Sequence, residues 1–440
     1  MDLRRKLARL RGTREPPEAP PEPPPDAAPE PAPALPSEPA VDDLRARLKA
    51  VAKRSRRRAE AAAPEAPPPA PWPFEGDPPC HARDLPEDAR HGDVSLRRAL
   101  EVTGDVVATL ALDPSLRAFD AARALFFDTE TTGLAGGTGT VAFLVGMAWF
   151  EGTSLRVEQL LLDDLDAEPA LLERVAERVR AAGSLVTFNG RSFDLPLLRA
   201  RFVMARVAPP PEPPHLDLLH VARRIYGARV ERCTLTTLER DVLGFARVGD
   251  VDGADIPARY LRFLREGAKA RPLLAPVVTH NAWDLAALAA LTGELGARAA
   301  RAEADGRFEA SDLVGIARTA HRAGDADRAV ALAAEAAALG DPAAARDAHV
   351  LAARVHQRRR DAERACARLL DALGHGDDPA LHLELARHYE RDLDDPARAL
   401  AHCLRAAGAE PPGAHARRAA RLRRKARDAR RRQLRLPGFE

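Results

Sequence analysis

The chain has 440 residues, of which 45% are hydrophobic and 30% charged, and its formal net charge is +2. This length accommodates two or three domains, and the composition is that of an ordinary soluble protein. The four cysteines lack C-x-x-C spacing, which argues against a zinc site or a disulfide framework and fits a reducing cytoplasm. The longest apolar run, at 141–150, is too short to span a bilayer, and nothing resembles a signal peptide. We therefore expect a cytoplasmic protein without a membrane partner.

The charge is distributed unevenly along the chain. Basic residues crowd both ends, at 4–11, 53–58 and 417–432, and such blocks are usually solvated, although some bind nucleic acid. Residues 1–82 alternate basic patches with proline-rich stretches, which cannot continue helices or central strands. We expect residues 1–82 to be disordered.

Residues 83–300 carry an α/β pattern. Strands are expected at 125–129, 141–150, 155–162 and 184–190, and helices at 168–183 and 192–207. The first three strands follow one another with short turns, and the "GGTGT" run at 136–140 is interpreted as a hairpin turn rather than a phosphate loop. This order predicts a mixed sheet with helices on its faces.

Residues 308–415 are alanine-rich and contain a repeat. Three similar segments align on Arg328-Ala329, Arg364-Ala365 and Arg398-Ala399, spaced by 36 and 34 residues. This period is close to the tetratricopeptide repeat of about 34 residues. An all-α tetratricopeptide-like domain that recruits a protein partner is therefore predicted, and the alternative is an irregular helical bundle. Residues 416–440 are expected to form a basic tail.

Two carboxylates directly follow the apolar residues 125–127. Asp128 and Glu130 are two residues apart in the expected strand, so their side chains share one face. Like charges this close disfavour joint ionisation unless a cation neutralises them, and oxygen-rich sites suit Mg²⁺ or Mn²⁺. A lone D-x-E would be interpreted as a strand end that meets solvent, but two later segments favour a metal site.

These two segments place polar residues at the ends of predicted elements. The stretch "LVTFNGRSFDLPLL" ends a strand at Asn189 and begins a helix near Asp194. The stretch "VVTHNAWDLAALAAL" predicts a strand that ends near Thr279 and a helix that carries His280 and Asp284 on one face. Four carboxylates and one imidazole in such positions predict a two-metal phosphoryl-transfer site.

The motifs D-x-E at Asp128–Glu130, N-x-x-x-F-D at Asn189–Asp194 and H-x-x-x-D at His280–Asp284 resemble the exonuclease motifs of the DEDD superfamily. The stretch 126–150, "FFDTETTGLAGGTGTVAFLVGMAWF", is similar to the bacterial YprB-type RNase H-like exonuclease family, and the resemblance extends over about residues 85–295. It implies an RNase H-like fold and two divalent cations, Mg²⁺ or Mn²⁺. The implied metal ligands are Asp128, Glu130, Asp194 and Asp284.

His280 departs from the superfamily pattern. There the third motif holds a tyrosine four residues before its aspartate or a histidine five residues before it, and His280 lies at the tyrosine spacing. As a base that activates water, His280 is chemically suitable. The alternative is that it only hydrogen-bonds a carboxylate.

Residues beside the motifs are candidates for binding substrate. Thr131, Thr132, Gly133 and Leu134 follow the first motif and are expected to line the path of the terminal nucleotide, and Asn189 belongs to the second motif. Phe193 is expected either to stack on a base or to pack in the core. Asp217 is interpreted as a cap and is left out of the metal set.

The leading hypothesis is a metal-dependent 3′–5′ exonuclease that uses two cations and acts on a single-stranded 3′ end of DNA or RNA. The preference for 3′ ends is implied by the resemblance alone. A non-catalytic RNase H-like scaffold that binds nucleic acid is the alternative, and an endonuclease on the same fold is another. No motif distinguishes DNA from RNA.

The C-terminal stretch "RRQLRLPGFE" suggests one more partner. Gln433–Phe439 resembles the Q-L-x-L-x-x-F class of sliding-clamp peptides, in which an extended tail places apolar side chains in a groove. The alternative is an arginine-rich end of the last helix that is stopped by Pro437-Gly438.

Overall fold

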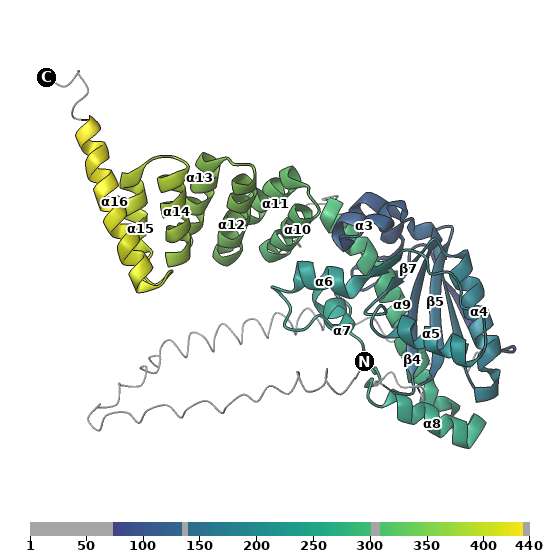
Figure 1. Ribbon diagram of the computed structural model, residues 1–440. Helices are drawn as coiled ribbons and strands as arrows, with labels where there is room; N and C mark the ends of the chain where they lie inside the picture. The colour runs from purple at the N-terminus through teal and green to yellow at the C-terminus, as the bar shows by residue number, and fades with distance from the viewer. Residues whose placement is uncertain (1–73, 134–139, 301–308, 434–440) are drawn as a thin grey trace, which may run out of the picture. The chain divides into compact units, whose positions relative to one another are not determined.

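The computed structural model describes residues 74–133, 140–300 and 309–433 (Figure 1). An α/β domain is followed by an all-helical region, which confirms the expected fold class. Most of the proline-rich stretch 1–82 and the clamp-like Gln433–Phe439 fall outside the residues whose side chains are described. Among the described helices, none has the length and apolar character needed to cross a bilayer.

The α/β domain is built on a mixed sheet of six strands in the order β1-β6-β5-β4-β7-β8. Strands β1, β6, β5 and β4 pair antiparallel, and β4, β7 and β8 pair parallel. The strands are β1 (Cys80–Leu85), β4 (Ala124–Thr131), β5 (Ala142–Glu151), β6 (Ser154–Leu161), β7 (Ser184–Thr187) and β8 (His215–Asp217); a separate hairpin pairs β2 (Arg90–His91) with β3 (Val94–Ser95).

Helices cover both faces of this sheet (Figure 1). One core contains residues of α3, α6 and most of α9, and the other contains residues of α4, α5 and α8. The α-helices are α3 (Gly104–Ala111), α4 (Glu168–Ala181), α5 (Asp194–Met204), α6 (Leu218–Tyr226), α7 (Leu235–Leu238), α8 (Ile256–Glu266) and α9 (Arg271–Ala300). Short 3₁₀ or π turns are η1 (Leu96–Glu101), η2 (Pro114–Ala118), η3 (Ala121–Arg123), η4 (Leu165–Ala167), η5 (Glu239–Leu243) and η6 (Gly267–Ala270).

Strand β4 contributes to both cores, because successive side chains of a strand point to opposite faces. Leu125 and Phe127 pack on the α4 and α5 side, and Phe126 packs on the α9 side. Asp128 and Glu130 therefore continue the face that α9 crosses. Three buried apolar residues before the carboxylates fix the register that brings both of them to this face.

The expected strand that ends near Thr279 is wrong, because residues 271–300 form the single helix α9. The run Val277–Thr279 is β-branched, which favours strands in isolation. In the fold, Leu274 and Val277 are buried against the sheet, and this tertiary packing outweighs the local preference. The predicted helix that carries His280 and Asp284 is confirmed, but it begins at Arg271 and not after Thr279.

The first strand was not predicted. β1 begins at Cys80, before the expected domain boundary at 83, and pairs with β6 at the edge of the sheet. The strand β8 was also missed, since it is only three residues long and follows a proline-rich stretch. Short edge strands carry too little sequence pattern to be recognised.

The helical region consists of helices that contact their neighbours in chain order (Figure 1). Its elements are α10 (Ala310–Arg322), α11 (Ala326–Ala338), α12 (Pro342–Arg358), α13 (Ala362–Leu373), α14 (Pro379–Arg391), α15 (Pro396–Arg405) and α16 (Pro412–Gln433). The three repeated Arg-Ala pairs occupy equivalent places in the first turns of α11, α13 and α15, where the alanines are fully buried. Whether these are tetratricopeptide repeats stays a prediction.

The last helix reaches into the expected tail. α16 (Pro412–Gln433) includes the whole stretch 416–433, so this part of the expected basic tail is helical. Ala419 and Leu422 are buried against the preceding helix, and these apolar contacts hold the arginine-rich helix in place.

Candidate active site

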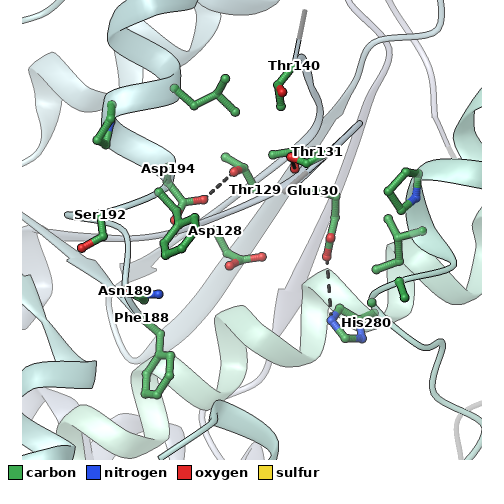
Figure 2. Close-up of a pocket in the computed structure, with 18 residues that line it drawn as sticks. Asp128, Thr129, Glu130, Thr131, Thr140, Phe188, Asn189, Ser192, Asp194 and His280 are labelled. Atoms are coloured by element: carbon green, nitrogen blue, oxygen red, sulfur yellow. Dashed lines mark hydrogen bonds and ion pairs between the residues drawn. The ribbon is translucent and has the colours of Figure 1, made fainter. Parts of the chain in front are cut away.

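A cavity of about 730 Å³ opens beside the end of β4 (Figure 2). It is lined by β4, by the loop and first turn of α5, by the start of α8 and by His280 from α9. The lining residues are Asp128, Thr129, Glu130, Thr131, Gly133, Thr140, Phe188, Asn189, Ser192, Phe193, Asp194, Pro196, Leu197, Gly253, Ala254, Ile256, Pro257 and His280. Three predicted metal ligands and the predicted base thus share one cavity.

Asp128 is held by a row of residues that crosses the sheet. Gly146 of β5 lies opposite Asp128, and Gln159 of β6 lies opposite Gly146. The Asn281 amide approaches over Gly146, where any Cβ would stand 2.1 Å from Asn281 Oδ1. Gln159 Nε2 donates to Asn281 Oδ1 (2.8 Å), which directs Asn281 Nδ2 to donate to Asp128 Oδ2 (2.8 Å). The absence of a side chain at Gly146 allows α9 to orient this carboxylate.

Glu130, His280 and Asp284 form a compact cluster of possible metal ligands. One ligand atom from each residue lies within 4.8 Å of the others. His280 Nε2 lies 3.9 Å from Glu130 Oε1 and 3.5 Å from Asp284 Oδ2 (the Glu130 contact is dashed in Figure 2). The i, i+4 relation of His280 and Asp284 on α9 produces this approach, as predicted from their spacing.

Asp194 approaches from the opposite side of Asp128 (Figure 2). It is the first residue of α5, and it accepts a hydrogen bond from Thr129 Oγ1. Neither Asp128 nor Asp194 belongs to the compact cluster, and Asp284 does not line the cavity. The four carboxylates therefore surround a common region but do not form one set of contacts in the described chain.

The carboxyl groups of the site hold their protons unusually tightly. Burial raises the pKa of Asp128 well above its usual range, and the charges of Asp284, Glu130 and Asp194 raise it further. Burial also raises the pKa of Glu130 to about 8, against the opposing charge of His280, and that of Asp194 to about 6, against its bond from Thr129. The pKa of Asp284 is raised by burial as well, although Arg247 and His280 lower it. Bound cations would remove this penalty.

His280 is oriented by a residue that the sequence analysis did not single out. Its Nδ1 lies 2.7 Å from Asp250 Oδ1, and because a carboxylate only accepts, Nδ1 carries the hydrogen. Nε2 then faces Glu130 and Asp284. Burial lowers the pKa of His280, but Asp250, Asp284 and Glu130 outweigh burial and raise it to about 9.

Arg247 is the second unexpected residue, and it forms the centre of a buried ionic network. Its guanidinium donates to Asp284 Oδ1, to Asp250 Oδ2 (3.2 Å) and to Glu239 Oε2 (2.7 Å). Glu239 in turn contacts His91 Nε2 of the β2–β3 hairpin (2.7 Å). Burial lowers the pKa of Arg247, but Asp284 and Glu239 more than compensate, so the guanidinium stays charged. The network links Asp284 to the residue that orients His280.

The predicted substrate-binding residues differ in their positions. Thr131, Gly133, Asn189 and Phe193 line the cavity, and the Phe193 side chain is 54% exposed, so it is not a core residue. Thr132 does not line it; the Thr132 Oγ1 accepts a hydrogen bond from Val141 N (3.0 Å) and closes the hairpin. Leu134 lies outside the described residues.

Asp217 shapes the second motif but does not enter the cavity. Its carboxylate caps α6 through Leu219 N (3.1 Å), as expected for a cap. It also accepts from Asn189 N (2.8 Å) and Arg191 N (3.1 Å). Asn189 has a φ of 68°, a left-handed conformation that asparagine tolerates better than most residues. Asp217 therefore holds the turn that directs Asn189 and Asp194 to the cavity.

Two comparisons with known proteins identify relatives of this region. Residues 125–295 match a family model described as the RNase H superfamily. The curated "Uncharacterized protein YprB" of Bacillus subtilis (strain 168) is 36% identical over 211 residues, which is 47% of this chain and 50% of that protein. The chain thus spans about half the length of the curated relative it matches. Both findings support an RNase H-like domain similar to YprB, and the family-model match contains every predicted ligand. The DEDD exonuclease type stays a prediction.

Proposed function

Because residues 125–295 form an RNase H-like domain of the YprB type, we propose that this protein is a metal-dependent nuclease that removes nucleotides from 3′ ends. The observation that carries the proposal is the convergence of Asp128, Glu130, Asp194 and Asp284 with His280. These residues come from three separate segments, and their charges act on one another. Polar groups buried at such a cost are typical of functional sites.

Two Mg²⁺ or Mn²⁺ ions fit the donor set. The four carboxylates provide the oxygen ligands that these ions prefer. Among these four, Arg247 contacts Asp284 alone in the described chain, so most of the negative charge has no guanidinium partner. When bound, the ions would neutralise charge on the scissile phosphate and lower the pKa of a water ligand.

His280 is suited to take the proton from the attacking water. Asp250 holds a hydrogen on Nδ1, and Nε2 faces Glu130 and Asp284. Cations that neutralise these two carboxylates would lower the raised pKa of His280 and free Nε2 to accept a proton. A base must lie within hydrogen-bond reach of the water it activates, and Nε2 faces the carboxylates that would hold that water. Asp250 acts through His280 and is a positioning residue in this scheme.

The terminal nucleotide would occupy the cavity between Phe193 and the β4 end. Phe193 offers an exposed aromatic face at the start of α5, and stacking on a base is worth about 1–3 kcal/mol. Thr131, Gly133 and Asn189 provide small and polar groups along the same wall. The preference for a 3′ end rests on the family resemblance, and the choice between DNA and RNA stays open. A non-catalytic scaffold would need no such set of desolvated carboxylates.

The test uses the full chain with single-stranded DNA and RNA labelled at the 3′ or the 5′ end. Each is incubated with Mg²⁺, Mn²⁺ or EDTA, and a circular single strand is run in parallel. We expect stepwise shortening from the 3′ end that requires the cation and leaves the circle intact. Cleavage of the circle would indicate an endonuclease. No cleavage of any substrate by folded protein would favour the scaffold.

A further inference from the structure

The last helix, α16, packs on the preceding helices through one narrow face, and only some of its basic residues form ion pairs there. Ala419 and Leu422 are buried, and Arg418 pairs with Glu410 (2.9 Å). On the same side of the helix, Arg421 and Lys425 both pair with Glu390, at 2.8 and 3.0 Å. These pairs fasten α16 to the preceding helices and account for three of its basic residues.

The opposite face of α16 carries four arginines with a regular spacing. Arg417, Arg424 and Arg431 follow one another at intervals of seven residues, close to two helical turns, and so form one row along the helix. Arg427 lies beside this row, between Arg424 and Arg431 in sequence. All four are exposed, and none has an ion pair with any residue that the structure describes. At 1.5 Å per residue, the row from Arg417 to Arg431 is about 21 Å long. We call these four residues the α16 arginine face.

The chemistry of this face indicates its ligand. Guanidinium groups bind phosphate through paired N–H donors and remain charged at every physiological pH. One acidic residue, Asp428, lies beside Arg424 and Arg431 on this face, and against four arginines a net positive charge of three remains. A membrane-surface helix would need an apolar face for the lipid, but the apolar residues of α16 are buried against protein.

We propose that the α16 arginine face binds the phosphate backbone of a nucleic acid, as a contact separate from the catalytic cavity. The identity of the nucleic acid as substrate rests on the proposed function, but the binding itself does not require catalysis. A rigid row of arginines would retain a strand between successive cleavage steps. The surface carries no feature that reads bases, so the binding is independent of sequence.

The test measures binding of the full chain to a fluorescein-labelled 30-nucleotide single strand in EDTA, by fluorescence anisotropy. One variant replaces Arg417, Arg424, Arg427 and Arg431 with glutamine, which keeps helix propensity. The matched control replaces four exposed arginines elsewhere, Arg117, Arg232, Arg265 and Arg322, with glutamine. We expect the first variant to bind about 10²-fold more weakly at 50 mM salt, and its plot of log affinity against log salt to be shallower by about 3. Circular dichroism verifies that both variants are folded.

The outcomes separate this proposal from the alternatives. An unchanged affinity and salt slope, or an equal loss in the control variant, would overturn it. Polyglutamate is added as a competitor. If it binds the α16 arginine face more tightly than the single strand does, and displaces the strand only when this face is intact, the ligand is an acidic protein partner instead. If the wild-type chain cleaves nothing but the expected binding difference is found, the proposed nuclease activity fails and this proposal stands.

Discussion

The α/β domain and the helical region use the same acidic side chain in opposite ways. In the helical region, Asp325, Asp361 and Asp395 each precede a helix and accept hydrogen bonds from its free backbone N–H groups. In the α/β domain, Asp128 and Asp284 are partly buried near other carboxylates, and burial raises the pKa of both. The capping aspartates stabilise their helices locally, whereas the converging aspartates are tolerated at a cost that only a ligand relieves.

Two glutamates extend this contrast. Glu130 of the cavity has a pKa that burial raises to about 8, and Glu390 of α14 has a pKa that its bond from Arg421 lowers to about 2. Both side chains are largely shielded from solvent. The difference is the neighbouring charge: Glu390 has two cations within 3.0 Å, and Glu130 has a histidine at 3.9 Å.

The largest effect is expected from the carboxylates of the cavity. Asp128→Asn, Glu130→Gln, Asp194→Asn and Asp284→Asn should each reduce cleavage by about 10³-fold or more, because several kcal/mol of charge stabilisation is lost. In EDTA, Asp128→Asn should raise the melting temperature, since it removes the cost of burying a carboxyl group whose pKa is raised well above its usual range. Cleavage of a labelled strand and thermal melts measure the two effects.

The control for these variants is Asp166→Asn, which changes an exposed aspartate outside the cavity. It should alter neither quantity. A folded Asp128→Asn enzyme with near wild-type cleavage would mean that the buried group is structural, and the contrast between the two regions would lose its functional meaning.

His280→Ala should slow cleavage by about 10²–10⁴-fold, which is the usual contribution of a general base. Affinity for Mn²⁺, measured by calorimetry without substrate, should change little, because a base acts on water. Asp250→Asn should reduce the rate less and alter the pH profile, since it keeps an acceptor for Nδ1 but removes a negative charge that raises the pKa of His280. A large loss of Mn²⁺ affinity in His280→Ala would instead assign His280 as a ligand. Restored cleavage in His280→Tyr would show that the position serves the role of the tyrosine in the related subgroup.

Arg247→Gln should reduce cleavage by about 10–100-fold, as is typical when a group that orients a ligand is removed. It removes the guanidinium that donates to Asp284, and it removes the positive charge that balances Glu239 and Asp250. Arg247→Lys keeps the positive charge but lacks the planar guanidinium with its paired N–H donors, so we expect its cleavage rate to lie between those of Arg247→Gln and wild type. The matched control is Arg240→Gln, which removes an exposed arginine that pairs only with its chain neighbour. Equal rates for Arg247→Gln and wild type would exclude a positioning role.

The sequence predicted the residues of the motifs better than it predicted the residues that hydrogen-bond and orient them. Asp128, Glu130 and Asp194 were recognised because an apolar strand or a helix start sets their position within a few residues. Asn281 and Gln159, by contrast, meet only after α9 has folded across Gly146, and no local pattern signals that contact. Arg247 lies in an irregular segment between helices, where its partners are distant in sequence.

The error at Thr279 has the same physical origin. A β-branched run predicts a strand if it is judged alone, whereas the structure has helix because Leu274 and Val277 are buried against the sheet. The cap at Asp217 was easier to predict, since a cap and its helix lie within four residues. Local chemistry was therefore predictable, and long-range contacts were not.

Opposite pH dependences are expected for the two glutamates. The folded-state pKa of Glu130 is raised, so the stability associated with its protonated form is present below about pH 4 and is lost as pH rises through 8. The folded-state pKa of Glu390 is depressed, so its contribution to the stability is present above about pH 4 and is lost as pH falls towards 2.

In EDTA, Glu130→Gln should stabilise the protein more at pH 9 than at pH 5. Glu390→Gln should destabilise it at pH 7 and hardly at all near pH 2. Urea unfolding at these pH values measures both differences, and parallel curves for the two variants would contradict the contrast.

The smallest effect concerns a cap of the helical region. Asp361 accepts from Arg364 N at 3.1 Å, so Asp361→Ala leaves a backbone donor of α13 without a partner and should cost about 1 kcal/mol of the free energy of unfolding. Asp361→Asn keeps an acceptor and should cost less. On the same helix, Asp371→Ala removes pairs with Arg368 and, at 3.9 Å, with His349, but no cap, and should be nearly neutral, which makes it the matched control. Cleavage by all three variants should equal that of the wild type, because no residue of α13 lines the cavity. A loss of cleavage in Asp361→Ala at full folding would mean that this helix acts on the catalytic domain, and the separation of the two kinds of aspartate would no longer hold.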